Sequence, residues 1–375
     1  RNRLAFATAA AVVASLAIGL GISLWRFAKE REALGRAVAA ERSATAERNS
    51  TEAVLRFVRD KILAAGRPEG LDGGLGKDVT LREAIQRAEA EIASAFTNHP
   101  LVEAKVRETI ADSYIHLGDA GLALPQAERA LALYREQLGI EDPLTVGAMS
   151  SLRRAHREAG IPFEFLPFCT NAFASAQSKW GPDHTNTLSV MNELATAYSE
   201  ARRFDEAIRV YGDLIRLRAA RFGTNTEVIE NMGELGRTHQ QNKDFDRAIA
   251  LLEQVRELTT AKWGSTDKRA FICLNDLAAA YHEAGRLERA VEVYLDALRS
   301  EAIGPRHYSR LITMGNLAVA YRDLGKADEA ISRFKETLRL RQAALEPAHP
   351  DTILTMILLG TTLAQAKRFD EAFPL

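Results

Sequence analysis

The sequence repeats with a period of about 42 residues over most of its length, and this repetition constrains the fold more than any other feature. An aromatic residue, His or Leu recurs at seven positions, here called the anchor residues: Tyr114, His156, Tyr198, His239, Tyr281, Tyr321 and Leu363. Nine residues after each anchor residue stand Ala123, Phe165, Ala207, Ala248, Ala290, Ala330 and Ala372. Self-similarity with a period of this size indicates an array of stacked helix pairs.

Each repeat is predicted to be an antiparallel pair of helices. The small residue lets the two helices approach closely, and the anchor residue fills the space between them. Four residues after the anchor residues stand Gly118, Gly160, Arg202, Lys243, Gly285, Gly325 and Lys367. Gly supplies a left-handed cap for the first helix, whereas Arg or Lys suits the negative end of its dipole. Because one pair cannot bury its apolar face alone, we predict an all-α solenoid over residues 80–375 with about seven repeats.

The second repeat departs from this pattern. Its segment EAGIPFEFLPF has Pro162 in the turn and the large Phe165 where the other repeats have Ala. A ring needs more room than a methyl group, so we expect a distorted or wider helix pair there. At the other end, the chain stops soon after Ala372, and the seventh repeat is predicted to be truncated.

An apolar segment without a charge runs from Leu4 to Trp25. Its 22 residues would form a helix about 33 Å long, enough to cross a hydrocarbon core of about 30 Å. A secretory signal peptide is the alternative, but its apolar stretch is shorter, about 7–15 residues. We therefore predict a single transmembrane helix with basic flanks over residues 1–27. Cations after the span favour a cytoplasmic C-terminal side, but residues upstream of Arg1 could reverse this, so the sidedness stays open.

Two segments connect the span to the repeats. Residues 28–65 are rich in Ala, Glu and Arg, which predicts a charged juxtamembrane helix. Residues 66–79 are rich in Gly but lack the Gly-x-x-x-x-Gly-Lys-Ser/Thr frame of a phosphate-binding loop, so we predict a flexible joint. Thr80 and Glu83 then predict a capping box. The helix after it is expected to bury the stripe Leu81, Ile85, Ala88, Ile92 and Phe96.

The repeats resemble a known family. The motif Leu-Ala-x-x-Tyr-x-x-x-Gly-x-x-x-x-Ala is legible at Leu277–Ala290 and Leu317–Ala330, and it resembles the tetratricopeptide repeat (TPR). The 42-residue period is similar to the kinesin-light-chain variety, over about residues 100–375. The resemblance implies a right-handed superhelix of helix pairs that binds proteins rather than catalysing a reaction.

By the same resemblance, the first helix of each pair lines a concave groove, at positions six and two residues before the anchor residue and one residue after it. In the middle repeats these positions supply the candidate groove residues Arg154, Arg157, Asn192, Ser199, Arg237, Gln240, Asn275, His282 and Arg322. Arg can hold a carboxylate through two hydrogen bonds, and Asn can hold an extended peptide backbone. We expect a protein or an extended peptide, acidic in character, although these side chains could simply be solvated.

The sequence predicts no catalytic, cofactor-binding or metal-binding residues in this chain. His184, His307 and His349 occupy one phase of the repeat, so repetition rather than metal binding explains them. Cys169 and Cys273 lie in different repeats and are expected to be small apolar fillers. A net charge of −1 gives no case for nucleic-acid binding.

The order of segments carries a second, broader resemblance. An apolar span after Arg-Asn-Arg, a charged helix and long TPR repeats are similar to the C-terminal part of receptor-like bacterial Ser/Thr protein kinases of the planctomycete type. In those proteins the catalytic domain precedes the span, and no kinase signature occurs in this chain. We therefore predict a single-pass membrane protein with a TPR scaffold. The alternative is the C-terminal portion of such a kinase, with its catalytic domain in cis upstream of Arg1.

Overall fold

The computed structural model describes residues 29, 31, 48–49, 51–68, 71, 73–76, 78–161, 164–345 and 349–374. The chain divides into two compact units, residues 1–110 and 111–375. The boundary falls within helix α3 (Pro100–Leu117). The predicted span Leu4–Trp25 lies outside the described residues. Within the described part, no helix is both long and apolar enough to cross a membrane.

The first unit contains a helical hairpin. A helix that begins by Thr51 ends in a π-helical turn, η1 (Val58–Ile62), and a 3-10 turn, η2 (Leu63–Gly66). It packs against α2 (Leu81–Ala95), and the rings of Phe57 and Phe96 lie 5.3 Å apart. The described part of the glycine-rich joint folds back onto the hairpin, since the Leu75 N–H donates to the Ala65 carbonyl at 2.8 Å.

The start of α2 follows the prediction, but one residue of the predicted buried stripe is exposed. The Glu83 N–H donates to the Thr80 hydroxyl at 3.2 Å, and the Glu83 carboxylate accepts from the Thr80 N–H at 2.8 Å, so the capping box is confirmed. Leu81 is 67% exposed, which contradicts its place in the predicted stripe. Ala84, one turn further on, is buried instead, because Leu81 directly follows the cap and lies outside the interface.

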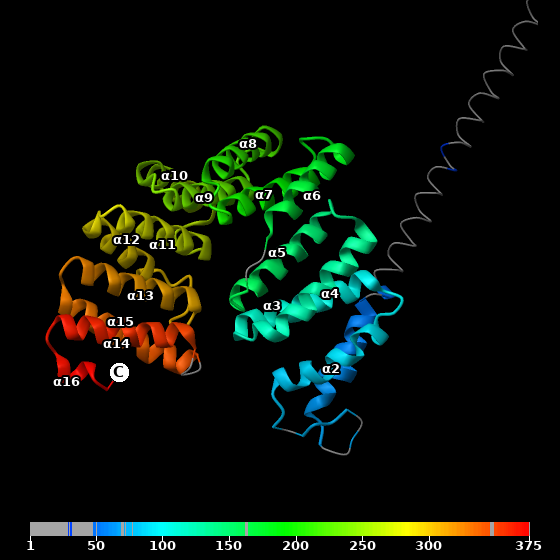
Figure 1. Cartoon of the computed structure of the whole chain (residues 1–375), viewed down its shortest axis with the longest axis horizontal. Coiled ribbons are helices and arrows are strands. Elements are labelled where there is room, and N and C mark those ends of the chain that lie inside the picture. Colours follow the sequence, from blue (N-terminus) through cyan, green and yellow to red (C-terminus); the bar gives the residue numbers. More distant parts are fainter. Residues whose placement is uncertain are drawn as a thin grey trace, which may run out of the picture. The chain divides into compact units, whose positions relative to one another are not determined.

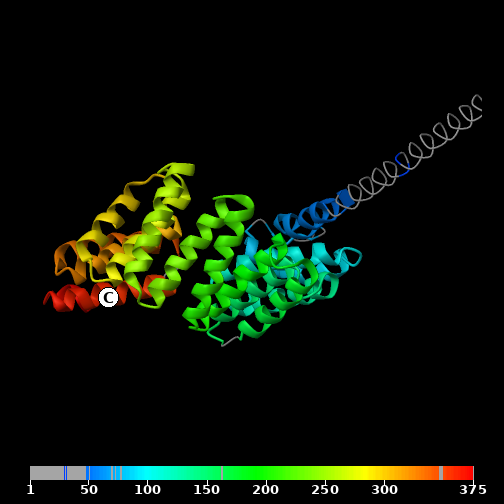
Figure 2. The same cartoon turned by 90° about the horizontal axis from the view of Figure 1, so that it is seen from above.

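The second unit is a stack of antiparallel helix pairs in which each helix from α6 onward packs against the next one in the chain (Figure 1). After α3, the first helices of the pairs are α5 (Pro143–Glu158), α7 (Thr185–Glu200), α9 (Thr226–Gln241), α11 (Lys268–Glu283), α13 (Tyr308–Asp323) and α15 (Pro350–Gln365). The second helices are α4 (Ala120–Leu138), α6 (Leu166–Trp180), α8 (Phe204–Phe222), α10 (Phe245–Trp263), α12 (Leu287–Arg299), α14 (Ala327–Ala344) and α16 (Phe369–Ala372). The described residues contain no strand, so the all-α superhelical fold is confirmed (Figure 2).

The predicted contact between paired helices lies at the centre of the repeats. Ala123, Ala207, Ala248, Ala290 and Ala330 are each fully inaccessible to solvent. Four anchor residues are buried beside them, namely Tyr114, His239, Tyr281 and Leu363, and the other three are half-buried. A methyl group at this position allows the backbones to approach while the anchor residue fills the remaining space.

The second repeat is wider, as its sequence predicts. Phe165 is only 4% exposed and packs in a cluster with Met149, Leu152 and Cys169. Helix α5 is in backbone contact with α4 and α7, and α6 with α7, but among the described residues α5 and α6 are not in comparable contact with each other. In the other repeats the small methyl group of Ala lets the backbones of the two helices approach closely. In the second repeat the Phe165 ring occupies that space.

All seven residues that follow the first helices have a left-handed backbone. The four glycines have φ between 68° and 78°, and Arg202, Lys243 and Lys367 have φ of 58°, 62° and 58°. From the sequence, Arg or Lys at this position was expected to stabilise the first helix through its charge, at the negative end of the helix dipole. The structure shows that the backbone conformation is the same, because the N–H of the following residue closes the cap on the anchor carbonyl, as Asp244 does on His239 at 2.9 Å.

Three histidines begin first helices. In each case the ring Nδ1 accepts a hydrogen bond at 3.2 Å from the backbone N–H two residues further on. The pairs are His184 with Asn186, His307 with Ser309, and His349 with Asp351. Asp142, Asn225 and Asp267 accept in the same way at the start of α5, α9 and α11. The repeated histidines are therefore helix N-caps, which explains their common phase.

Replacing Lys243 by Gly is predicted to raise the free energy of unfolding by about 0.5–1 kcal/mol, because Gly adopts a left-handed backbone without the steric cost of a Cβ. Gly285→Lys, the reverse change at the same phase, is predicted to lower it by a similar amount. A Cβ at Gly285 would meet no atom within 4 Å, so the backbone alone decides the result. Urea denaturation followed by circular dichroism measures both. Equal stabilities for Lys and Gly at these positions would contradict the argument.

Replacing His307 by Ala is predicted to lower the free energy of unfolding by about 0.5–1 kcal/mol, because it leaves the Ser309 N–H without its cap. His307→Asp is the matched control, since a carboxylate accepts the same bond and suits the positive end of α13. This variant is predicted to be at least as stable as the parent in the same denaturation assay. A His307→Ala variant with unchanged stability would refute the capping role.

Candidate binding surface on the first helices

Several neighbouring first helices contact one another and form a layer. Contacts join α5 to α7, α9 to α11, and α11 to α13. From α7 onward each first helix also packs between two second helices, as α9 does between α8 and α10. Side chains on the remaining face of the first helices therefore form one surface that runs along the second unit.

The nine predicted groove residues all lie on this layer. Arg154 and Arg157 are on α5, Asn192 and Ser199 on α7, Arg237 and Gln240 on α9, Asn275 and His282 on α11, and Arg322 on α13. Arg157 is the most exposed of the cations, with 63% of its side chain accessible, against 34% for Arg154 and 26% for Arg322. The repeat phase therefore brings the nine residues to a common layer.

Polar side-chain contacts link the successive first helices from α3 to α13. The Asn231 amide of α9 donates to Asn192 of α7 at 2.6 Å, and the Thr313 hydroxyl of α13 donates to Asn275 of α11 at 2.9 Å. The two contacts are equivalent: each joins a residue eight positions before its anchor residue to an Asn six positions before the anchor residue of the preceding repeat. Further contacts of this kind are Arg154–Asp112, Ser150–Glu193, Arg153–Glu200, Ser199–Gln241, Arg237–Asp276 and His282–Asp323. We call these eight pairs the polar ladder.

All four predicted arginines have carboxylate partners on the layer, and Arg157 pairs with Glu158 at 3.5 Å. Arg154 lies 2.6 Å from Asp112, and Arg322 lies 2.9 Å from Asp323. Arg237 pairs with both Glu234 and Asp276. A cation that is compensated within the array attracts an outside carboxylate less than a free cation does.

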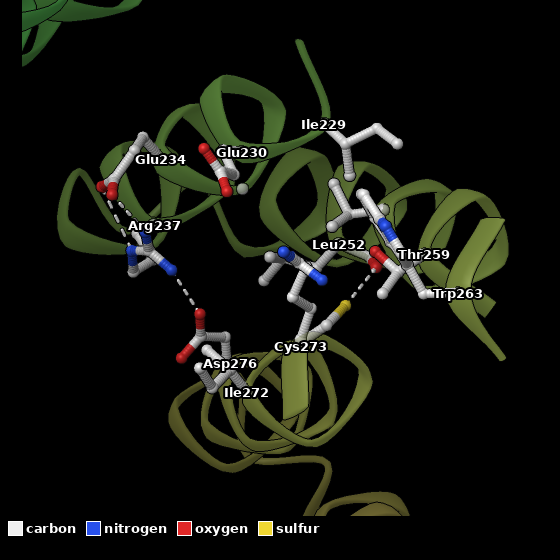
Figure 3. A pocket seen from close by; sticks show the side chains of 13 residues that line it. Ile229, Glu230, Glu234, Arg237, Leu252, Thr259, Trp263, Ile272, Cys273 and Asp276 are labelled. Atoms are coloured by element: carbon white, nitrogen blue, oxygen red, sulfur yellow. Dashed lines mark hydrogen bonds and ion pairs between the residues drawn. The ribbon is translucent and has the colours of Figure 1, made fainter. Parts of the chain in front are cut away.

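A pocket of about 250 Å³ lies among α9, α10 and α11 (Figure 3). Its apolar wall comes from all three helices and consists of Ile229, Leu252, Val255, Trp263, Ile272 and Cys273. Glu230, Glu234 and Arg237 line it from α9, and Asp276 lines it from α11. Figure 3 shows Arg237 between Glu234 and Asp276 on one side, with Ile272 next to Asp276, and Ile229, Leu252 and Trp263 on the other side.

Burial shapes the charges in this pocket. Burial raises the pKa of Asp276 above its ordinary value, although the Arg237 guanidinium opposes the shift. Burial alone would lower the pKa of Arg237, but Asp276 and Glu234 raise it above its ordinary value. Burial, with a smaller effect from Asp276, raises the pKa of the Cys273 thiol to about 12. The thiol is therefore protonated at neutral pH and does not act as a nucleophile.

Gly233 is buried and lines the pocket. A Cβ built there would meet no atom within 4 Å, although the residue lies in the middle of α9. Gly costs a helix interior about 0.5–1 kcal/mol relative to Ala. The pocket therefore has free space at a position where most repeats carry a polar side chain.

Sequence reasoning placed the pocket arginine but missed the rest of the pocket. Glu230, Glu234 and Asp276 lie outside the three lining phases taken from the resemblance. A glycine at a lining phase, Gly233, was the available signal, since it removes a side chain from the layer. Within the described part of the chain, no three His, Cys, Asp or Glu residues are placed to hold a metal ion.

Comparisons with known proteins agree with this geometry. Sequence models of the tetratricopeptide repeat match residues 187–226, 226–300 and 301–375, which together make up half of the chain. The chain belongs to the tetratricopeptide-repeat family, whose fold commonly serves as a scaffold for protein–protein interactions. No curated protein sequence matches it.

Several solved structures are similar to the chain. NprR in complex with its cognate peptide NprX is 14% identical, with 78% of this chain and 85% of that one covered and a TM-score of 0.50. The apo form of RapI is 12% identical, with coverages of 72% and 73% and a TM-score of 0.50. Repeats assigned to a kinesin light chain of Podosopora anserina are 23% identical, with coverages of 53% and 94% and a TM-score of 0.43. At these identities the first two similarities show a shared fold alone.

Replacing Arg237 by Ala is predicted to lower the free energy of unfolding by about 1–2 kcal/mol, because it leaves the Asp276 carboxylate without its cation. This value lies below that of a fully buried pair, since 36% of the Arg237 side chain is exposed. Arg299→Ala is the control, because Arg299 and its partner Asp296 are 76% and 56% exposed. It is predicted to change stability by less than about 0.5 kcal/mol. Equal effects in urea denaturation would show that the pocket pair is an ordinary surface pair.

Proposed function

We propose that this chain is a scaffold that binds an extended peptide or a peptide segment of a partner protein along its first-helix layer. The observation that carries the proposal is the pocket among α9, α10 and α11, which opens on the layer where the nine groove residues lie. Apolar side chains at its base and polar side chains at its rim are the usual composition of a binding pocket.

The polar ladder supports a preformed surface. Its pairs hold neighbouring first helices in register, so the layer does not have to be ordered when a partner binds. A preorganised surface loses less conformational entropy on binding, which raises the affinity for a given contact area. Two predicted groove residues outside the ladder, the exposed Arg157 and the half-buried Gln240, also lie along the layer. The peptide seen with NprR, which shares the fold, is consistent with this use.

The proposal includes a membrane attachment through Leu4–Trp25. It rests on the length and composition of that segment. A link to a Ser/Thr kinase domain in cis rests on the order of the segments alone. Flotation of the full chain with lipid vesicles, compared with a chain lacking residues 4–25, tests the attachment. The codons upstream of Arg1 test the kinase link.

Selection from a random displayed peptide library tests the proposed binding. The full chain, held in lipid nanodiscs, is the bait, and empty nanodiscs serve as the control. The proposal expects enriched peptides that bind the chain with micromolar or better affinity in fluorescence anisotropy. A selection that enriches no peptide above the empty nanodiscs would refute peptide binding.

Replacing Arg322 by Ala is predicted to weaken the binding of a selected peptide that spans the last repeats by about 5–10-fold, as for a contact near the centre of an interface. Arg333→Ala is the matched control, because Arg333 lies on the second helix α14 and pairs with Glu336 at 3.0 Å. It is predicted to leave the affinity unchanged. Equal losses in both variants would place the peptide outside the first-helix layer.

A further inference from the structure

We infer that the pocket among α9, α10 and α11 binds one apolar side chain of a peptide whose neighbouring residue is Lys or Arg. The inference rests on the proposed function, because it names the chemistry of the peptide that the scaffold would bind. It also replaces the acidic ligand expected from the arginines by a basic one.

The size of the pocket suits a single side chain. Its volume of about 250 Å³ lies below the range of about 300–1,000 Å³ that is usual for small-molecule sites. It is far larger than the space that one buried water needs, about 10–15 Å³. Ile229, Leu252 and Val255 form an apolar wall, and Trp263 adds an aromatic face. Burying a Leu or Phe side chain there would remove its apolar surface from water, which makes an anchoring contact.

The charges at the pocket favour a cation beside that side chain. Glu230, Glu234 and Asp276 line it with three carboxylates, and Arg237 compensates them only in part. The other lining cation, Arg269, is turned to Asp267 at 3.3 Å and lies over the Trp263 ring at 4.7 Å. Arg218 also interacts with Glu230, so the three carboxylates exceed the cations that compensate them, Arg237 and Arg218, by one. An acidic peptide would add a further negative charge to this group, whereas a Lys or Arg would reduce the repulsion.

Exposed Glu230 is the carboxylate best placed to receive the cation. Glu234 and Asp276 already hold Arg237 from both sides (Figure 3). Glu230 lies one helical turn before Glu234 on α9, at the same side of the pocket. A basic residue next to the inserted side chain would therefore lie over the first half of α9.

Three synthetic peptides test the inference against the full chain in nanodiscs. Each is a labelled Gly-Ser dodecamer with a central triplet, which is Lys-Leu-Lys, Glu-Leu-Glu or Lys-Ser-Lys. Fluorescence anisotropy is predicted to give the tightest binding for Lys-Leu-Lys, with at least tenfold weaker binding for each of the other two. Preference for Glu-Leu-Glu, or equal binding of Lys-Leu-Lys and Lys-Ser-Lys, would overturn the inference.

Two variants locate the bound peptide. Gly233→Leu fills the open space at the mouth of the pocket and is predicted to weaken Lys-Leu-Lys at least tenfold. Gly212→Leu is its control, because Gly212 lies on the second helix α8, away from the pocket, with open space around its Cβ. It is predicted to leave the affinity unchanged. Glu230→Gln is predicted to weaken Lys-Leu-Lys about threefold and to leave Lys-Ser-Lys unaffected. Full binding by Gly233→Leu, with the circular dichroism spectrum of the parent, would overturn the inference.

Failure of this inference and failure of the proposed function give different results. If the displayed library yields peptides that bind Gly233→Leu as well as the parent chain, the scaffold function stands and the pocket assignment falls. If the library yields no peptide and Lys-Leu-Lys does not bind, both fall together.

Discussion

Close contact between paired helices at one alanine per repeat is the constraint on which the rest of the structure depends. Five of these alanines are fully inaccessible to solvent, and Ala290 and Ala330 pack in clusters with the anchor residues Tyr281 and Tyr321. The contact sets the distance between the two helices of a pair, and stacking of the pairs then brings the first helices into one layer. The second repeat shows the same rule from the other side, because Phe165 in place of Ala is accompanied by a wider helix pair.

Two kinds of interaction hold that layer together. Apolar contacts between helices provide the stability, and the polar ladder links successive first helices through side chains in different repeats. Most predicted groove residues take part in the ladder, so they contribute to the register of the array as well as to its surface. At Gly233 the layer lacks a side chain, and the apolar interior between α9 and α11 becomes accessible there. The site is thus a local departure from the repeat.

The fold was predictable because it follows from local periodicity. The anchor residues, the alanines and the left-handed caps lie at fixed spacings, and each is decided by contacts within one helix pair. The partners of Arg237 were not predictable, because Asp276 belongs to the next repeat and its approach depends on the rotation between repeats. The N-cap role of His307 was predictable in principle, because Asp and Asn, which are preferred N-cap residues, occupy the same position in other repeats. Lys243 was expected to stabilise its helix through its charge. The structure shows that the residue at this position is set by its left-handed backbone conformation, which a lysine in the sequence does not indicate.

Methyl NMR of the full chain in nanodiscs tests the central claim most directly, that the first-helix layer receives a peptide side chain in its pocket. The δ1 methyl groups of Ile229 and Ile272 line the pocket, whereas Ile353 and Ile357 are exposed on α15 at the far end of the array. The account predicts that the Lys-Leu-Lys peptide shifts the resonances of Ile229 and Ile272 in a saturable way and leaves those of Ile353 and Ile357 in place. Shifts confined to Ile353 and Ile357, or no saturable shift at Ile229 and Ile272, would contradict it.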